Sequence, residues 1–164
     1  MDEEPNSLSL DRWLEKGGPA AASFARLWDS LWRQTRIAPE MLEHCRLTLA
    51  RLHGDSRELA LANDRIEATP AFAARRAAVI GDHALADEAF GAGEQAILLF
   101  AEYYWTDAQS ITDAVADDVK AHHGDAGLVF LIEALGCIDG RIRAARCLRA
   151  LETQNIAKEA AHVA

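Results

Sequence analysis

The chain has little of several features that often reveal a function. Its 164 residues include only three Cys and four Pro, and no Cys-x-x-Cys occurs. An odd number of widely spaced Cys excludes a disulfide framework and is typical of a reducing compartment. A Gly-rich phosphate loop, HExxH, GxSxG and an EF-hand loop are also absent. Nucleotide hydrolysis, zinc proteolysis and serine hydrolysis are therefore not expected.

Positive charge is also scarce. The chain has 17 Lys and Arg against 26 Asp and Glu, a net charge of −9. Because phosphate binding needs clustered Lys and Arg, nucleic acid is not an expected partner. The longest apolar stretch, 128–138, contains Glu133 and is far shorter than the about 20 residues that a membrane span needs. The acidic N-terminus does not resemble a signal peptide, so we expect a cytoplasmic protein with no membrane partner.

The composition favours one all-α domain. Ala, the best helix former, makes up roughly a fifth of the chain, β-branched residues are few, and half of the residues are hydrophobic. About eight helices are expected. The pattern of apolar residues and helix breakers predicts helices over 6–15, 19–35, 39–54, 56–66, 70–80, 93–105, 110–124 and 125–151, with a linker or short helix over 82–88.

Several of these segments carry a familiar pattern. PEMLE at 39–43 leads into RLTLARLHG at 46–54, and EQAILLFAE follows at 94–102. ITD at 111–113 opens another helix, and 134–148 reads as a closing helix. In order and spacing these strings resemble the carboxymuconolactone decarboxylase and alkyl hydroperoxidase D-like superfamily. The resemblance implies an alkyl hydroperoxidase D-like helical bundle.

The redox residues of that superfamily are not present. Its thiol branch carries Cys-x-x-Cys directly after the Gly and a His four residues further on, and these places are Asp55, Glu58 and Ala62 here. The family's Glu, twelve residues before the first Cys, is kept as Glu43. Because the reaction needs a thiolate and a resolving thiol within reach, we expect no dithiol peroxide reduction.

The decarboxylase branch is matched in part. Residues 57–62 keep its Glu-Leu-x-Leu but lose the flanking His residues. The resemblance covers about 39–148 and implies a family-like domain over 37–151, after an N-terminal helical extension over 1–36 and before a tail over 152–164. It also implies a homo-oligomer, a trimer or a hexamer.

Three carboxylates are the first candidates for catalysis. Asp55 and Glu58 lie at i, i+3, so a helix would place them on one face, as a general acid and a general base. The alternative is a capping pair, with Asp55 as N-cap and Glu58 at N3. Glu43 would point toward Asp55 if its helix packs as in the family, and its alternative is a solvated helix face. Three converging carboxylates would raise the pKa of at least one of them, because like charges resist joint ionisation.

Other candidates are less specific. His53 directly precedes the Asp55 segment, and its alternative is a surface or core histidine. Arg141 matches the family's Arg and would hold a substrate carboxylate, or else form a structural ion pair. Trp28 and Trp32 would line an apolar substrate pocket, or else belong to the core and to a subunit contact.

Two functional hypotheses follow. The first is a cofactor-independent lyase, decarboxylase or isomerase that uses these carboxylates on a small organic acid or lactone. The second is a non-catalytic helical oligomer that kept the scaffold. Neither hypothesis calls for a metal ion or another cofactor.

Overall fold

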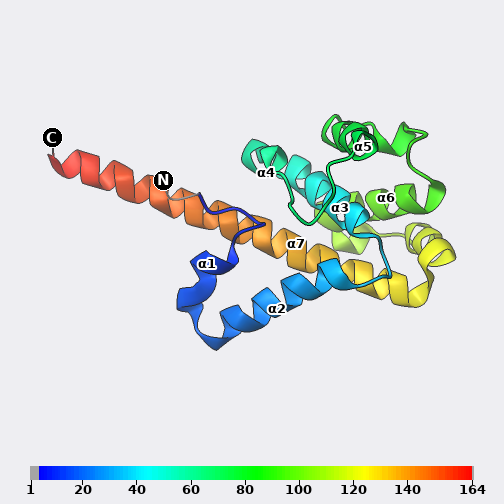
Figure 1. Cartoon of the computed structure of the whole chain (residues 1–164), viewed down its shortest axis with the longest axis horizontal. Coiled ribbons are helices and arrows are strands. Elements are labelled where there is room, and N and C mark those ends of the chain that lie inside the picture. The colour runs from blue at the N-terminus through cyan, green and yellow to red at the C-terminus, as the bar shows by residue number, and fades with distance from the viewer. Residues whose placement is uncertain (1–3, 164) are drawn as a thin grey trace.

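The computed structural model confirms the all-α class (Figure 1). It describes the backbone of residues 4–163, and the side chains of that range except Lys16 and 155–163. This part of the chain contains seven α-helices, three short 3-10 helices and no strand. The elements are α1 (Asp11–Leu14), η1 (Glu15–Gly17), α2 (Pro19–Arg33), α3 (Pro39–Leu52), α4 (Ser56–Ala60), α5 (Pro70–Ile80), η2 (Ala84–Ala86), α6 (Ala92–Thr106), η3 (Ala108–Ser110) and α7 (Asp113–Val163).

Proline marks the start of three helices. Pro19, Pro39 and Pro70 occupy the first turn of α2, α3 and α5. Proline suits this position because the missing N–H would have no partner in the helix and the fixed φ is already helical. The α5 start is strengthened by Thr69, whose side chain accepts a hydrogen bond from the N–H of Phe72. These local signals are the reason why the predicted starts of the three helices are correct.

Helix α3 lies at the centre of the bundle. It contacts α2, α4, α5, α6 and α7, and every residue from 41 to 50 is buried. A helix that is buried on all sides normally carries only apolar residues. This one also buries Glu43, His44 and Arg46, so each charge there must find a partner inside the protein.

Helix α7 runs along the length of the molecule in Figure 1. Its one non-helical residue is Gly124, with φ 69° and ψ 173°, where the predicted helices 110–124 and 125–151 meet. A side chain would be strained at this φ, and glycine is not. No helix in the described part of the chain combines the length and the apolar character needed to cross a bilayer.

The structure differs from the sequence-based expectation at two helices. The predicted helix 6–15 is wrong in its first half, because 6–9 is irregular and α1 begins at Asp11. The predicted helix 56–66 ends at Ala60, since Leu61 is extended. At the C-terminus, α7 continues to Val163, so 152–163 of the predicted tail is helical. Residues 1–3 and Ala164, which belong to the predicted extension and tail, lie outside the described residues.

The predicted N-terminal extension takes part in the main core. Trp28, Leu31 and Trp32 of α2 are buried in the same hydrophobic cluster as Leu42 and Leu49 of α3. The indole rings of Trp28 and Trp32 meet edge to face, with centroids 5.1 Å apart. Removal of α2 would therefore expose the core of the bundle.

Candidate functional site

Glu43 and Arg46 form a bidentate ion pair inside α3. Nε and Nη2 of Arg46 donate to Oε2 and Oε1 of Glu43 at 2.9 and 2.6 Å. The side-chain amide of Asn63 donates to Oε2 of Glu43 at 2.8 Å. All three side chains are buried, so the surrounding protein weakly screens these interactions. The carboxylate of Glu43 is thus fixed in orientation from two sides.

This pair begins a row of alternating charges. The ionic row, as we call it, runs Glu43, Arg46, Glu58, Arg149, Asp55. Nη1 of Arg46 lies 3.3 Å from Oε2 of Glu58, and Nη1 of Arg149 lies 3.4 Å from Oε1. Nη2 of Arg149 bonds the carboxylate of Asp55. The structure therefore brings the three predicted carboxylates into one cluster. Arg46 lies between Glu43 and Glu58, and Arg149 lies between Glu58 and Asp55.

Asp55 is also the N-cap of α4. Its Oδ1 accepts a hydrogen bond from the N–H of Glu58 at 3.2 Å, which confirms the capping interpretation of this pair. Glu58 does not complete a capping box, because its carboxylate turns inward to Ser7 and to the two arginines of the ionic row. Asp55 thus combines the cap with an ion pair.

The N-terminal segment 5–11 closes the ionic row. The N–H and the hydroxyl of Ser7 donate to Oε1 and Oε2 of Glu58 at 2.8 and 2.6 Å. Nη1 of Arg149 donates to the carbonyl of Pro5 at 2.7 Å. Glu58 is fully buried, and its carboxylate accepts hydrogen bonds from Ser7, Arg46 and Arg149. Acid/base work by Glu58 would require displacement of this segment.

A cavity of about 260 Å³ lies at the Glu43 end of the ionic row. We call it the Glu43 cavity. Three polar side chains line this cavity, those of Glu43, Asn63 and Arg76. Its largest apolar side chains are Leu61, Ile66 and Phe72. Arg76 donates to the carbonyls of Leu59 and Leu61, which keeps the chain after α4 in place. Glu43, although buried, is thus one of the residues that line an otherwise largely apolar hollow.

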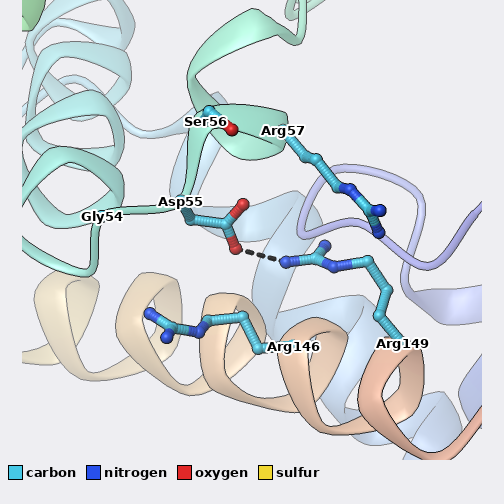
Figure 2. A pocket seen from close by; sticks show the side chains of 6 residues that line it. All are labelled: Gly54, Asp55, Ser56, Arg57, Arg146 and Arg149. Carbon is cyan, nitrogen blue, oxygen red and sulfur yellow. Dashed lines mark hydrogen bonds and ion pairs between the residues drawn. The ribbon is translucent and has the colours of Figure 1, made fainter. Parts of the chain in front are cut away.

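A shallow surface hollow of about 280 Å³ lies at the Asp55 end of the ionic row. We call it the arginine cavity. It is lined by Gly54, Asp55, Ser56, Arg57, Arg146 and Arg149. Figure 2 shows Asp55 between α4 and α7, with the guanidinium groups of Arg57 and Arg149 on one side of it and that of Arg146 on the other. Glu58 lines neither of the two cavities.

His53 is placed apart from the carboxylates. Its Nε2 lies 2.6 Å from Oδ1 of Asp139, and the indole N–H of Trp105 donates to its Nδ1 at 3.5 Å. Asp139 also accepts a hydrogen bond from Arg143 at 2.6 Å, as its i, i+4 spacing predicts. His53 therefore ties the end of α3 to α6 and α7, and its side chain lines neither cavity.

The predicted substrate-binding residues also lie apart from the cavities. The guanidinium of Arg141 stacks over Trp28 at 4.3 Å and donates to Ser7 O and to the carboxylate of Asp11, both at 2.7 Å through Nε and Nη1. This is the structural ion pair of the alternative interpretation. Trp28 and Trp32 lie in the core and line neither cavity.

His44 is buried without a hydrogen-bond partner on either ring nitrogen. Its ring stacks on Phe72, with centroids 5.2 Å apart. Burial, with a smaller effect of the nearby Arg75 charge, lowers the pKa of His44 to about 4. His44 is therefore neutral near pH 7 and packs like an aromatic core residue.

Two of the three cysteines are buried. Cys45 is fully buried on α3, and burial raises the pKa of its thiol to about 12. Burial also raises the pKa of Cys137, to about 11. A thiolate is the reactive form, so neither thiol is a good nucleophile near neutral pH.

Sequence reasoning missed Arg46, Arg149 and Ser7. Arg46 follows Glu43 at i, i+3, which is a usable local signal for an ion pair. Arg149 lies 94 residues after Asp55, and Ser7 lies 51 residues before Glu58, so only the tertiary fold pairs them. Within the described side chains, no cluster of three His, Cys, Asp or Glu is arranged to hold a metal ion.

Comparison with known proteins does not identify a family for this chain. The chain matches no family model, no curated protein and no solved structure.

Proposed function

We propose that this chain is a carboxymuconolactone decarboxylase-like enzyme that binds a small organic acid or lactone in the Glu43 cavity and moves a proton on it without a cofactor. The observation that carries the proposal is Glu43, which is buried in the protein and is one of the residues that line a largely apolar cavity. Glu43 is also the position that the sequence resemblance retains.

The cavity suits a compact ligand. Binding sites for small molecules are typically concave and mostly apolar, with a few polar groups that fix orientation. The Glu43 cavity has that character, with Leu61, Ile66 and Phe72 as apolar walls. Its volume of about 260 Å³ is slightly below the roughly 300–1,000 Å³ of drug-sized sites, so the ligand is a small one.

The residues around the cavity have separable roles in this proposal. Glu43 takes a proton from a carbon next to a carbonyl group and returns it at another atom. Arg46 and Asn63 hold its carboxylate and so act as positioning residues. Arg76 lies on the cavity wall, where its guanidinium would attract a substrate carboxylate. Asp55 and Glu58, the other two predicted acid/base residues, instead complete the ionic row.

A cavity-filling pair of variants tests the binding half of the proposal. Ala73 lines the cavity from α5, and Ala74 is an exposed neighbour that does not. Ala73→Leu is expected to abolish the binding of small carboxylates and lactones found by ligand-observed NMR, and Ala74→Leu to leave it unchanged. If both variants bind these compounds as the wild type does, the ligand site is elsewhere and the proposal fails.

The alternative is a non-catalytic helical oligomer, which a different observation favours. Val129 and Ile132 of α7 are 63% and 46% exposed. Val129 lines a shallow, largely apolar hollow, which also contains Arg36, Asp125, Ala126, Phe130 and Glu133. Val129→Glu would turn an oligomer measured by light scattering into a monomer, and an unchanged mass would argue against this surface as the subunit contact.

A further inference from the structure

One long face of α7 has no partner within the described part of the chain. Three of the five exposed large hydrophobic side chains that the structure describes lie on this helix, at Val129, Ile132 and Leu151. The bundle packs against other faces of α7, mainly through α6 and α3. Spacings of three, four and seven residues place the exposed residues in one line along the helix. The α7 stripe, as we call it, consists of Val129, Ile132, Gly136, Gly140, Cys147 and Leu151, all of them exposed.

The middle of the α7 stripe is open to the approach of another backbone. Gly136 and Gly140 are both exposed, and a Cβ at Gly140 would meet no atom within 4 Å. Neither glycine has a positive φ, so the helix itself does not require them. Glycine weakens a helix interior, and close approach of a second backbone is a common reason to find it there.

Two opposite charges flank these glycines. Glu133 is exposed and takes part in no hydrogen bond or ion pair among the described side chains. Arg143 is 61% exposed and donates only through Nε, to Asp139, which leaves both of its Nη groups for another acceptor. Ten residues of helix, about 15 Å, separate Glu133 from Arg143, so the two cannot meet within one chain.

We propose that the α7 stripe binds a second copy of this chain, with the two α7 helices antiparallel about a twofold axis level with Ile138. This arrangement places Gly136 against the partner's Gly140 and Glu133 against the partner's Arg143, and symmetry repeats each contact. The charges are complementary only in this direction, because a parallel pair would place Glu133 beside Glu133. The occupant is therefore a second copy, aligned by its own charges.

The same register covers the exposed apolar side chains. Val129 lies opposite the partner's Cys147, and Ile132 lies opposite the partner's Ala144. A contiguous exposed apolar surface with a polar rim is typical of a protein interface. The pairing gives a definite arrangement to the subunit contact of the alternative function. It holds equally if Glu43 is catalytic, because the lining of the Glu43 cavity includes no described residue of α7.

Analytical ultracentrifugation of the full chain tests the pairing first. At about 100 μM the wild type is expected to be a dimer, with twice the 17.9 kDa mass of the chain. Gly140→Leu is expected to be a monomer, since the new side chain fits the single chain but keeps the two helices apart. Ala74→Leu, on an exposed position of α5, is the control and is expected to remain dimeric. A monomeric wild type, or a stable oligomer in Gly140→Leu, would overturn the pairing.

Charge exchange tests the register. Glu133→Arg and Arg143→Glu are each expected to weaken the dimer by about tenfold or more, because each brings like charges together across the twofold axis. The double variant Glu133→Arg/Arg143→Glu restores both ion pairs and is expected to dimerise nearly as well as the wild type. A double variant weaker than either single variant would overturn the register. Glu43→Gln is expected to remain a dimer, so a failed reaction and a failed pairing are distinguishable.

A short bis-maleimide cross-linker tests the direction. Cys147 is exposed, whereas Cys45 and Cys137 are buried. In the antiparallel pair the two Cys147 residues lie about 27 Å apart along the helices, so the wild type is expected to give no linked dimer. Val129→Cys is expected to link to the partner's Cys147, and Val129→Cys with Cys147→Ser to give no link. A linked wild type, or no link in Val129→Cys, would overturn the antiparallel arrangement.

The native Cys147 reports on the same contact. Its reaction with iodoacetamide is expected to slow as the protein concentration rises, because the dimer covers Cys147 and the monomer exposes it. A rate that stays constant while the dimer forms would place the contact elsewhere and overturn the proposal.

Discussion

The guanidinium of Arg46 binds both the main-chain carbonyl and the side-chain carboxylate of Glu58, which lies twelve residues later in the sequence. Nη1 of Arg46 donates to the carbonyl oxygen of Glu58 at 3.0 Å and lies 3.3 Å from Oε2. The same guanidinium holds Glu43 through Nε and Nη2. Arg46 therefore joins α3 to α4 and is the centre of the ionic row.

Removal of Arg46 is expected to destabilise the fold strongly. Arg46→Met would leave Glu43 and Glu58 buried without the cation between them, and breaking a buried pair in this way costs about 3–5 kcal/mol. The free energy of unfolding in urea measures the effect. Arg33→Met is the control, because the Arg33 side chain is 76% exposed and its pair with Asp29 contributes little. Similar stabilities for the two variants would show that the ionic row is not structural.

The hydroxyl of Ser7 is expected to stabilise the N-terminal segment. Ser7→Ala removes a 2.6 Å bond to the buried carboxylate of Glu58 and is expected to cost about 1–3 kcal/mol in urea unfolding. Ser9 offers a matched control, since its buried hydroxyl has no hydrogen-bond partner. Ser9→Ala is therefore expected to be neutral or slightly stabilising, and a larger loss in Ser9→Ala than in Ser7→Ala would contradict the structure.

His44 is expected to make stability depend on pH. Its pKa is lowered from 6.5 to about 4, so the unfolded chain binds more protons between these values. The contribution of the neutral ring is thus complete above pH 6.5 and is lost as the pH falls toward 4. The loss amounts to about 3 kcal/mol, from the size of the shift.

The test replaces His44 by an apolar residue. Urea unfolding of His44→Leu is expected to show less loss of stability than the wild type between pH 6.5 and 4. His83→Ala, which removes an exposed histidine, is expected to keep the wild-type pH dependence. A wild-type profile in His44→Leu would mean that other groups cause the acid sensitivity.

The cysteines are expected to differ in reactivity. The pKa of Cys45 is raised to about 12 by burial, whereas Cys147 is exposed. Iodoacetamide followed by mass spectrometry is therefore expected to label Cys147 in the folded protein, and Cys45 only after unfolding. Rapid labelling of Cys45 under native conditions would contradict its buried position, and would reopen thiol chemistry for this chain.

Local sequence signals predicted much of the helical architecture. The starts of α2, α3 and α5 followed from proline, and the break at Gly124 followed from glycine. The helix predicted over 6–15 failed because Asn6 and Ser7 use their polar groups elsewhere. The side-chain oxygen of Asn6 accepts from two backbone N–H groups, and Ser7 bonds Glu58.

The site was predicted only in part, for a physical reason. Asp55 as a helix cap follows from local spacing, whereas the burial of Glu43 was not predicted. Arg149, the arginine partner of Asp55, comes from a helix much later in the chain, and no spacing rule links α4 to that turn of α7. Whether a carboxylate is paired therefore depended on long-range packing, which local sequence patterns do not encode.

Proton exchange at carbon is the most direct test of a catalytic Glu43. A panel of small organic acids and lactones is incubated with the protein in D₂O, and NMR follows deuterium at the carbon next to the carbonyl. The wild type is expected to exchange a member of the panel, and Glu40→Gln, which changes a half-exposed carboxylate on the same helix, to match it. Glu43→Gln is expected to be slower by about 100-fold or more. Equal rates in Glu43→Gln and the wild type, or no exchange by the wild type with any compound that binds the Glu43 cavity, would contradict the proposed function.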